Sequence, residues 1–431
     1  MNRLLCIYIQ NHNYASFLEK CMDSIVPQLN NDIELIFIDD GSSDNSKDVI
    51  ENYSLYFDKL IFLPESIGLV KSANIAVKES SANYIMRIDA DDWATPNAIS
   101  QYLDLLKTQN YDCVFPDYFV VDEEGESLYE FKRNKNSINH NFDLPFHGAF
   151  TAIKRSFLVE IDFYDEAFNR QDGYFIWLSA IKNSKSLKHI DRPLFSYRSH
   201  PTSLSKDLRS LYTTRFEIKK KVFGELYKDI STALIIPLSF SSFGQERVKL
   251  IRKIIDYCSS DTIKYSIYIM SDASCKEEVA LTNQFSSEVE GVEFRQKSKT
   301  YHEQVKSLVS HFELDNFIIA EPDYPLLNLK TISELVLTAR IFNWDVVSTI
   351  LLDTNTYYFH NGEGLNPLTR NSTIRSERND LYRKAGGLVF YRNMGFLDEQ
   401  VFDESRHGHV LIDELSSIRV SSYLKTLNFE Q

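Results

Sequence analysis

The strongest constraint on how this chain folds is a pair of short apolar runs that each end in clustered acids. Residues 36–38 lead into Asp39 and Asp40, and residues 84–88 lead into residues 89–92, which hold three aspartates. Apolar runs of this length are typical of buried strands, and the carboxyl ends of parallel strands meet at one edge of a sheet. We therefore expect these acids to converge on one crevice of an α/β sheet.

The chain alternates strand-like and helix-like segments in two separate regions, which is the rhythm of a wound α/β sheet. The expected strands are residues 4–9, 34–38, 59–63, 84–88 and 113–117, then 233–237, 265–270, 316–320 and 345–350. The second region lacks counterparts of the acidic clusters and is therefore no tandem copy of the first. We expect two Rossmann-like α/β domains, at residues 1–205 and 231–431, joined by a helical connector at residues 206–230.

The three aspartates Asp89, Asp91 and Asp92 occupy four successive positions, which folding alone explains poorly. Hard oxygen ligands of this kind suit Mn²⁺ or Mg²⁺, which usually bridge to a substrate phosphate. The alternative is that acids after a strand are turn residues and helix caps, as Asp and Ser often are. We favour a metal site for these three residues and the capping role for Ser43 and Asp44.

Composition excludes several classes of function. The formal net charge of −14 argues against binding to nucleic acid or to anionic lipid, since both need a basic surface. The five cysteines show no CxxC or zinc-like grouping, and buried thiols in a reducing compartment are the simplest interpretation. The amino terminus shows no signal-peptide pattern, and no apolar stretch is long enough to cross a bilayer. We expect a cytoplasmic enzyme without a transmembrane segment.

Residues 3–205 resemble a family 2 glycosyltransferase with the GT-A fold. Four segments in order carry the resemblance: residues 5–14, 38–44, 67–74 and 89–92. They are similar to the family's first strand and nucleotide loop, its nucleotide-binding signature, its glycine, basic and asparagine segment, and its DXD metal motif. The resemblance implies a metal-dependent inverting transferase that moves a hexosyl or N-acetylhexosaminyl group from a nucleotide-diphosphate donor, UDP-linked, to a cell-surface glycan or lipid-linked acceptor.

The resemblance also implies which residues bind the nucleotide sugar: Gln10, Asn13, Asp39, Asp40, Lys71, Asn74, Asp91, His147, Arg198 and His200. Asp40 would accept a hydrogen bond from a uracil-type imide, while Asp39 would support it or cap the turn. Asp91 and Asp92 would hold Mn²⁺ or Mg²⁺ on the diphosphate, with Asp89 supporting. A solvated side chain remains open for Lys71, and a packed structural histidine for His147.

An inverting transferase needs a base near the acceptor hydroxyl, and one carboxylate can serve. Asp172 stands just before an apolar helical pattern, in a segment that resembles the family's Glu-Asp motif. We predict that Asp172 is this base, and the alternative is that it caps the helix that follows. Gln171 stands where the family more often has a glutamate, which removes one negative charge from the acceptor side.

The second half resembles, more weakly, the cytidylyltransferases that activate acidic sugars of the sialic acid and Kdo type. Residues 235–237, 268–272, 291–295, 320–327 and 378–390 carry the resemblance in order. It implies Asp323 as a metal ligand, against the alternative of a turn aspartate. The phosphate loop at residues 238–249 departs from the family, because it offers only Arg247 and Lys249 as cations, opposed by Glu246.

This departure leaves two interpretations of the second half, and we favour the first. Either the domain keeps the fold without nucleotidyl transfer, or a cation site is assembled from Arg247, Lys249, Arg295, Arg378 and Arg383. Three classes of function therefore compete: a single glycosyltransferase, a bifunctional glycosyltransferase and CMP-acidic-sugar synthetase, and a non-catalytic sugar-nucleotide binding protein. Intact acids at both motifs make the third class the weakest.

Overall fold

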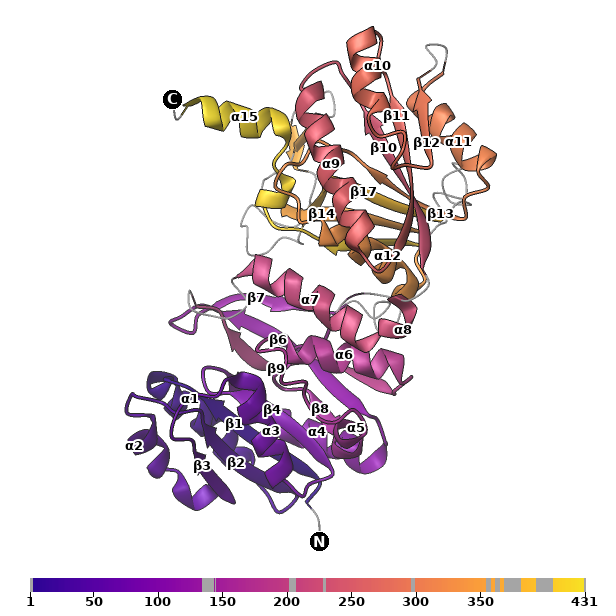
Figure 1. Ribbon diagram of the computed structural model, residues 1–431. Helices are drawn as coiled ribbons and strands as arrows, with labels where there is room; N and C mark the ends of the chain where they lie inside the picture. The colour runs from indigo at the N-terminus through magenta and orange to yellow at the C-terminus, as the bar shows by residue number, and fades with distance from the viewer. Residues whose placement is uncertain are drawn as a thin grey trace. The chain divides into compact units, whose positions relative to one another are not determined.

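The computed structural model describes residues 3–133, 143, 145–200, 207–227, 230–295, 299–353, 358–360, 365–367, 381–392 and 406–429. These residues divide into two compact units (Figure 1): the first takes the described residues up to Ile218, and the second those from Lys219 onward. The expected connector contains two helices, α7 (Leu208–Val222) and α8 (Gly224–Tyr227).

Unit 1 is built on one sheet whose strand order is β3-β2-β1-β4-β8-β6-β9-β5, with β7 paired to β6. The first four strands are parallel: β1 (Leu5–Asn11), β2 (Ile33–Asp39), β3 (Lys59–Phe62) and β4 (Tyr84–Asp89). The others are β5 (Trp93–Ala94), β6 (Cys113–Val121), β7 (Ser127–Phe131), β8 (Ala152–Lys154) and β9 (Leu187–Arg198). Strand β8 is antiparallel to β4, and β5 is antiparallel to β9.

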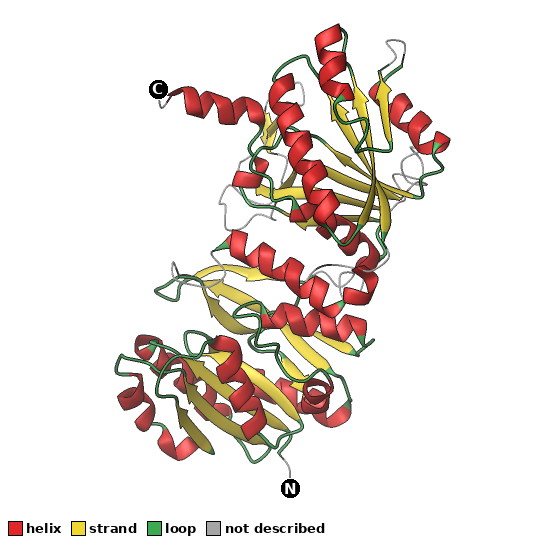
Figure 2. Cartoon of the chain, in the orientation of Figure 1, coloured by secondary structure: helices red, strands yellow, loops and turns green. Residues whose placement is uncertain are grey.

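The helices of unit 1 cover both faces of this sheet (Figure 2). They are α1 (Ala15–Ile25), α2 (Ser46–Glu51), α3 (Leu69–Glu79), α4 (Ala98–Thr108), α5 (Arg155–Glu160) and α6 (Asp172–Lys182). Leu5, Ile7 and Ile9 of β1 share a core with the apolar stripes of α1 and α4. The alternate residue Gln10 donates to Ser72 of α3, on the other face. Burial on both faces explains why β1 is a continuous buried run.

Unit 2 holds a second sheet of order β12-β11-β10-β13-β17-β14-β18, in which β12, β11, β10 and β13 are parallel. The strands are β10 (Ser231–Leu238), β11 (Lys264–Ser271), β12 (Gly291–Phe294), β13 (Asn316–Ala320), β14 (Val346–Asp353), β17 (Leu381–Arg392) and β18 (His407–Leu411). Strand β17 runs antiparallel to both β13 and β14. The short strands β15 (Tyr358–His360) and β16 (Leu365–Pro367) form a separate pair.

Besides α8, the described helices of unit 2 are α9 (Gly244–Ser260), α10 (Lys276–Asn283), α11 (Tyr301–His311), α12 (Lys330–Phe342) and α15 (Val420–Phe429). Val305, Leu308 and Val309 of α11 pack against one set of strand residues, in a core that includes Ile235 and Phe317. Short 3-10 helices lie at Val26–Gln28, Ser54–Tyr56 and Leu415–Ser417.

The expectation of an α/β chain with a GT-A-type sheet followed by a second Rossmann-like sheet is confirmed. Every expected strand is present, with ends that differ by at most a few residues because apolar pattern marks strand cores better than strand ends. None of the helices in the described part of the chain combines the length and the apolar character that crossing a bilayer requires.

Candidate functional site

The acidic cluster lies where β4 ends, at the carboxyl edge of the parallel strands. Asp89 is the last residue of β4, and Asp91 and Asp92 follow in the turn before β5. Asp92 Oδ1 accepts a hydrogen bond of 2.9 Å from the backbone N–H of Arg198, which ends β9. Pairing of β5 with β9 therefore fixes the turn that carries the acids. The strand-end placement expected from the sequence is what the fold produces.

Burial and mutual repulsion disfavour the charged forms of these acids. Burial raises the pKa of Asp89 to about 6, opposed by the charge of Arg87 and assisted by that of Asp91. Burial also raises the pKa of Asp92 well above its usual range, and the charges of Asp91 and Asp89 add to the effect. Asp92 Oδ2 is buried and accepts no hydrogen bond from the described residues. A cluster with these properties favours a cation nearby.

The donor set fits Mn²⁺ or Mg²⁺ only if a substrate supplies further ligands. Among the described residues, no three His, Cys, Asp or Glu side chains converge closely enough to hold a metal by themselves. Mg²⁺ is commonly held by one or two carboxylates together with substrate phosphates. The unpartnered Oδ2 of Asp92 fits that pattern, and metal binding by Asp89, Asp91 and Asp92 stays a prediction.

Arg87 links the acidic cluster to the predicted base. It lies inside β4 with only 6% of its surface exposed. Its Nε lies 2.8 Å from Asp89 Oδ1, and its Nη1 contacts Asp172 Oδ2 in a second ion pair. Burial alone would lower the pKa of Arg87, but the charges of Asp172 and Asp89 outweigh it and raise that pKa. One buried guanidinium therefore joins two acids that are 83 residues apart in the sequence.

Asp172 does not cap helix α6. It is the first residue of the helix, the N-cap is Gln171, and the cap makes no side-chain hydrogen bond to the backbone. Gln171 Oε1 instead accepts from Arg215 Nε at 2.9 Å. The capping alternative for Asp172 is therefore not what the structure shows, and its carboxylate is 8% exposed beside Arg87. Its role as the base stays a prediction.

Two glycines leave room for this ion pair. A Cβ on Gly148 would lie 2.9 Å from an Arg87 guanidinium nitrogen and 3.3 Å from both Asp172 oxygens. A Cβ on Gly173 would lie 2.9 Å from the backbone of Gly148. Both distances are too short for ordinary packing, so the close approach of these segments depends on glycine.

His200 and Arg198 contact the acidic turn. His200 Nε2 lies 3.0 Å from Asp91 Oδ2, and its ring packs against Tyr14 and Phe17. Arg198 Nε donates to the backbone carbonyl of Asp91 at 3.0 Å. Its guanidinium lies over the rings of Phe17 and Trp93. The resemblance implied both residues as nucleotide-sugar ligands. The described contacts of Arg198 hold the acidic turn in place, and donor binding by the two residues stays a prediction.

The predicted nucleotide turn is held together by its own side chains. Asp39 accepts from Asn11 Nδ2 and from the N–H of Ser42, each at 2.7 Å. Asn13 Oδ1 accepts from the N–H of Ser43 at 2.7 Å. Asp39 therefore caps the turn, which is one of the two roles expected for it. Asp44 also acts as a cap, since it accepts from the N–H groups of Ala15 and Ser46.

Asp40 organises the loop before α3. Its two oxygens accept hydrogen bonds from Ser66 Oγ and from the N–H groups of Ile67 and Gly68, at 2.8 to 2.9 Å. Only 4% of Asp40 is exposed. The predicted contact with a uracil imide would have to be made beside these three bonds, and it stays a prediction.

The remaining predicted nucleotide residues differ in their surroundings. Gln10 is buried and donates to Ser72 Oγ at 2.6 Å. Asn74 is buried and exchanges hydrogen bonds with the backbone of Tyr164. Lys71 is exposed in the first turn of α3. His147 packs between Tyr118, Phe195 and Tyr197, and burial lowers its pKa to about 4. A neutral histidine cannot attract phosphate by charge at neutral pH.

Two of the candidate residues of unit 2, Arg247 and Asp323, form an ion pair. Arg247 Nε lies 2.6 Å from Asp323 Oδ1, and its Nη1 donates to the carbonyl of Ser239 at 2.8 Å. Lys249 is exposed on α9. Arg378 lies outside the described residues. The described part of unit 2 thus uses Arg247 to neutralise the acid that the sequence proposed as a metal ligand.

Sequence reasoning missed Arg87 as a site residue, although a signal was present. Arg87 stands between the apolar residues Met86 and Ile88 in a run that reads as a buried strand. A buried arginine needs an acidic partner, so its position predicted a salt bridge without naming the partner. It also missed Asn11, whose amide holds Asp39.

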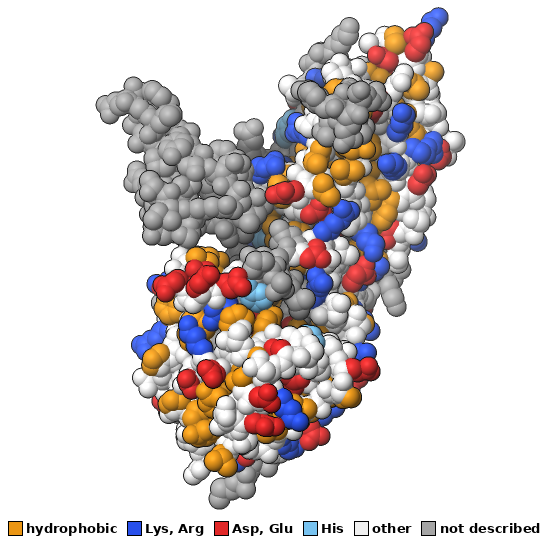
Figure 3. All heavy atoms as spheres, turned by 90° about the vertical axis from the view of Figure 1, so that its left-hand side faces the viewer, with side chains coloured by type: hydrophobic (Ala, Val, Ile, Leu, Met, Phe, Trp, Pro, Cys, Tyr) orange, Lys and Arg blue, Asp and Glu red, His pale blue; other side chains and the backbone are white. Residues whose placement is uncertain are grey.

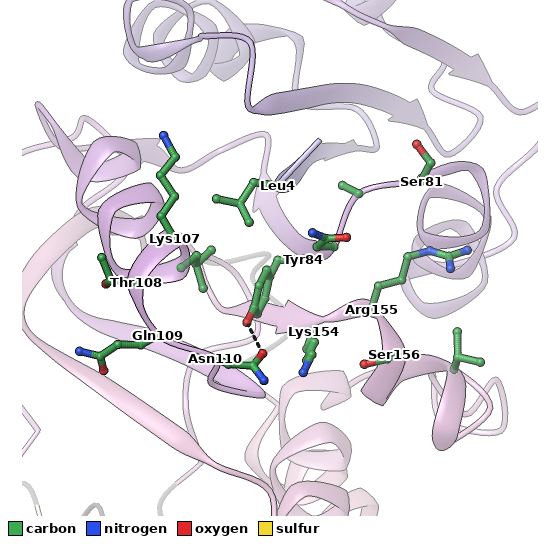
Figure 4. A pocket seen from close by; sticks show the side chains of 14 residues that line it. Leu4, Ser81, Tyr84, Lys107, Thr108, Gln109, Asn110, Lys154, Arg155 and Ser156 are labelled. Carbon is green, nitrogen blue, oxygen red and sulfur yellow. Dashed lines mark hydrogen bonds between the residues drawn. The ribbon is translucent and has the colours of Figure 1, made fainter. Parts of the chain in front are cut away.

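One described cavity lies away from the acidic cluster. It measures about 670 Å³ and opens at the amino-terminal ends of β1 and β4, where Leu4 and Tyr84 line it. Lys107, Lys154 and Arg155 also line this cavity but do not converge on one point (Figure 4). Acidic and basic side chains are intermixed on the described part of the face in Figure 3. The cavity lies at the opposite end of β4 from the acidic cluster.

The arrangement of acids after β2 and β4 can now be set beside known proteins. Residues 6–164 match the family model described as Glycosyl transferase family 2. The match contains the nucleotide turn and the acidic cluster, and it ends before Asp172 and before unit 2. The match supports a sugar-transferring enzyme of the GT-A type for residues 6–164, the family 2 segment. The resemblance of the second half to cytidylyltransferases receives no support from these comparisons.

Several curated relatives are similar to part of this chain. The glycosyltransferase GlyA of Streptococcus pneumoniae is 23% identical over 219 residues, which is 47% of this chain and 31% of that protein. The chondroitin synthase of Pasteurella multocida is 25% identical over 328 residues, 72% of this chain and 32% of that protein. The chain thus spans about a third of the length of these two relatives.

Solved structures show a more distant likeness. S. aureus TarS in complex with UDP-GlcNAc is 12% identical, with a TM-score of 0.44 over 60% of this chain and 73% of that one. A mannosyltransferase from Pyrobaculum calidifontis, in complex with GDP-Man and Mn²⁺, is 13% identical, with a TM-score of 0.40 over 52% and 64%.

Proposed function

We propose that the chain is a metal-dependent, inverting glycosyltransferase that transfers a sugar from a UDP-linked donor to a cell-surface glycan acceptor. The single observation that carries the proposal is the meeting of Asp89 and Asp172 on Arg87. It brings an acid outside the family 2 segment next to the acidic cluster inside that segment. A transferase needs both a place for the donor diphosphate and a base for the acceptor, and these two groups of acids supply them.

Asp91 and Asp92 would hold Mn²⁺ or Mg²⁺, with Asp89 supporting. When bound, such an ion offsets the negative charge that develops on the departing nucleotide diphosphate, so no acid is needed there. His200 and the Arg198 backbone hold Asp91 and Asp92 in place. The turn held by Asp39, Asn11 and Asn13 would receive the nucleoside.

Asp172 would take the proton of the acceptor hydroxyl as that oxygen attacks the anomeric carbon. One positioned carboxylate contributes a rate factor of about 10² to 10⁴ in such a step. Asp172 Oδ2 contacts Arg87, and the Asp172 side chain as a whole is 8% exposed. Attack from the face opposite the departing diphosphate inverts the configuration of the sugar.

The donor class can be tested by thermal shift on the full chain with UDP-, dTDP-, GDP- and CMP-sugars, each with and without Mn²⁺. We expect a rise in melting temperature with UDP-sugars that depends on Mn²⁺ and disappears in Asp91→Ala. Asp172→Ala should keep the shift, because the proposed base does not touch the donor diphosphate. If none of the nucleotide sugars raised the melting temperature, the proposal would be contradicted. A rise that persists in Asp91→Ala would also contradict it.

For unit 2 we infer a role other than nucleotidyl transfer. The pairing of Arg247 with Asp323 supports this, because neither side chain is left to hold a triphosphate or its metal. Incubation with CTP and sialic acid or Kdo should therefore release no pyrophosphate above the background of the heated protein. Stoichiometric release would favour the bifunctional alternative instead.

A further inference from the structure

We propose that Arg87 is a positioning residue that holds Asp172 in place for proton transfer and ties it to Asp89 of the acidic cluster. This inference rests on the proposed glycosyl transfer and adds a residue to its machinery. Arg87 itself would contact neither donor nor acceptor. It would act through the two carboxylates that its guanidinium contacts.

The guanidinium is suited to this bridge by its shape. Its Nη1 donates a hydrogen bond to Asp172 Oδ2, and its Nε lies 2.8 Å from Asp89 Oδ1 in an ion pair without hydrogen-bond alignment, so one planar group contacts two acids. Arginine presents several donors in a fixed fork, whereas a lysine ammonium is a single point charge on a flexible stem. A change in the position of Arg87 is therefore passed to both carboxylates at once.

The bridge is anchored on a rigid element. Arg87 lies within β4, which pairs with β1 on one side and with β8 on the other. The carbonyl of Arg87 also accepts a hydrogen bond of 2.8 Å from the N–H of Phe150. Asp172, by contrast, begins a helix after a residue with positive φ, Gln171. The strand thus supplies a fixed point from which the guanidinium orients a side chain on another element.

The Arg87–Asp172 ion pair is tightly packed and shielded from solvent. Gly148 lies against both the guanidinium and the Asp172 carboxylate, where any Cβ would come within 2.9 Å of Arg87. Arg87 and Asp172 are 6% and 8% exposed at their side chains. Water therefore has little access to replace the ion pair, and a carboxylate left without its cation at this depth would reorient or draw in solvent.

The test is a double-mutant cycle in the full chain with Arg87→Met and Asp172→Asn. Turnover is measured as UDP release from whichever of UDP-glucose, UDP-galactose, UDP-GlcNAc and UDP-GalNAc the wild type uses. In the wild-type background we expect Arg87→Met to lower kcat about 100-fold, with the donor KM changed by about threefold or less. In the Asp172→Asn background the same substitution should change kcat by about threefold or less, because the carboxylate that accepts the proton is already gone and Asp89 takes no part in proton transfer.

An equal loss of kcat in both backgrounds would overturn the inference, since Arg87 would then act independently of Asp172. Arg87→Lys adds a second criterion, because one ammonium cannot bridge two acids. The kcat of Arg87→Lys should reach about a tenth of the wild-type value at most. A wild-type kcat in this variant would contradict the proposal that Arg87 bridges Asp89 and Asp172. Where Arg87→Met does not fold, the cycle is run with Arg87→Lys under the same criterion.

Lys219→Met is the matched control. Lys219 Nζ lies 3.0 Å from Glu334 Oε1, and this pair is also buried, but it belongs to unit 2. We expect this variant to lower the melting temperature and to leave kcat unchanged. If it lowered kcat as much as Arg87→Met, the Arg87 effect would reflect general destabilisation and the inference would be wrong.

The two levels of the proposal fail in different ways. If the wild type neither binds UDP with Mn²⁺ nor releases UDP from any of the four sugars, the glycosyl transfer proposal fails and the inference falls with it. If the wild type turns over and Asp172→Asn is inactive, but the Arg87 cycle is additive, only the inference about Arg87 fails.

Discussion

The carboxyl edges of the two sheets carry different charge balances, although both units are wound α/β folds. In unit 1, Asp89, Asp91 and Asp92 gather after β4, and Arg87 is shared between Asp89 and Asp172. In unit 2, Arg247 pairs with Asp323, the acid that follows β13. The edge of unit 1 therefore keeps acids that could bind a cation, while at the edge of unit 2 the acid Asp323 is neutralised by Arg247.

Other charged groups near Asp323 in unit 2 also compensate one another. Burial raises the pKa of Glu321, and the charges of Arg419 and Lys384 oppose the shift. Burial lowers the pKa of Lys384, and the charge of Glu321 opposes that shift in turn. One architecture can thus present an acidic site or a self-compensated edge, depending on where the sequence places its cations. Fold alone does not assign function to either unit.

The largest expected effect tests whether the edge of unit 1 is catalytic. Asp172→Asn keeps the shape of the side chain and removes the group that would accept the proton. We expect kcat for glycosyl transfer to fall about 10³-fold, with Mn²⁺-dependent UDP binding kept within about threefold. UDP release under saturating donor and calorimetry with UDP measure the two. Undiminished turnover would remove Asp172 from the mechanism.

A smaller effect tests the surplus of negative charge. Asp92→Asn removes a carboxyl group that would ionise when Mn²⁺ binds, and it replaces the group that holds the buried, unpartnered oxygen with an amide. We expect the affinity for UDP to fall about 100-fold in the presence of Mn²⁺ and to change little in its absence. Calorimetry at fixed Mn²⁺ gives both values. An equal loss with and without Mn²⁺ would mean that Asp92 supports the fold of the turn and does not serve a metal.

The neutralised edge of unit 2 predicts an effect on stability. Arg247→Met leaves Asp323 without its cation, and the two side chains are 13% and 23% exposed. We expect the free energy of unfolding to fall by about 1–3 kcal/mol, less than for a fully dry pair. The double variant with Asp323→Asn should recover about half of the loss. Urea unfolding measures it, and an unchanged midpoint would show that solvent already screens this pair.

The smallest effect concerns His147, which lies beside the charged network of unit 1. Burial, with the charge of Arg87 adding to it, lowers the pKa of His147 from 6.5 to about 4. Between these values the unfolded chain binds a proton that the folded protein does not, so stability falls as the pH drops through this range. We expect the wild type to lose about 1 kcal/mol or more beyond His147→Phe between about pH 7.5 and 4.5.

Chemical denaturation of both proteins at the two pH values measures this difference. Asp89 also titrates in that range, because its pKa is raised, but both proteins share it and the comparison cancels it. Equal losses in the two proteins would show that His147 is protonated as easily in the folded as in the unfolded chain.

Local pattern was enough to predict the strands and the acids at their ends. Residues 84–88 read as a buried strand from their apolar character, and β4 spans Tyr84–Asp89. The capping role of Asp44 also followed from residue type, because Asp satisfies nearby N–H groups in many turns. These features depend on neighbours in the chain, which the sequence displays directly.

The partners of the charged residues were decided by the tertiary structure alone. Arg87 meets Asp172, Asp40 holds the N–H groups of residues 67 and 68, and Arg247 meets Asp323, across separations of 27 to 85 residues. An ion pair needs a few ångströms between two atoms and a burial that prevents water from replacing either partner. Residue types state which pairs are chemically allowed, and only the packing of strands and helices selects among them.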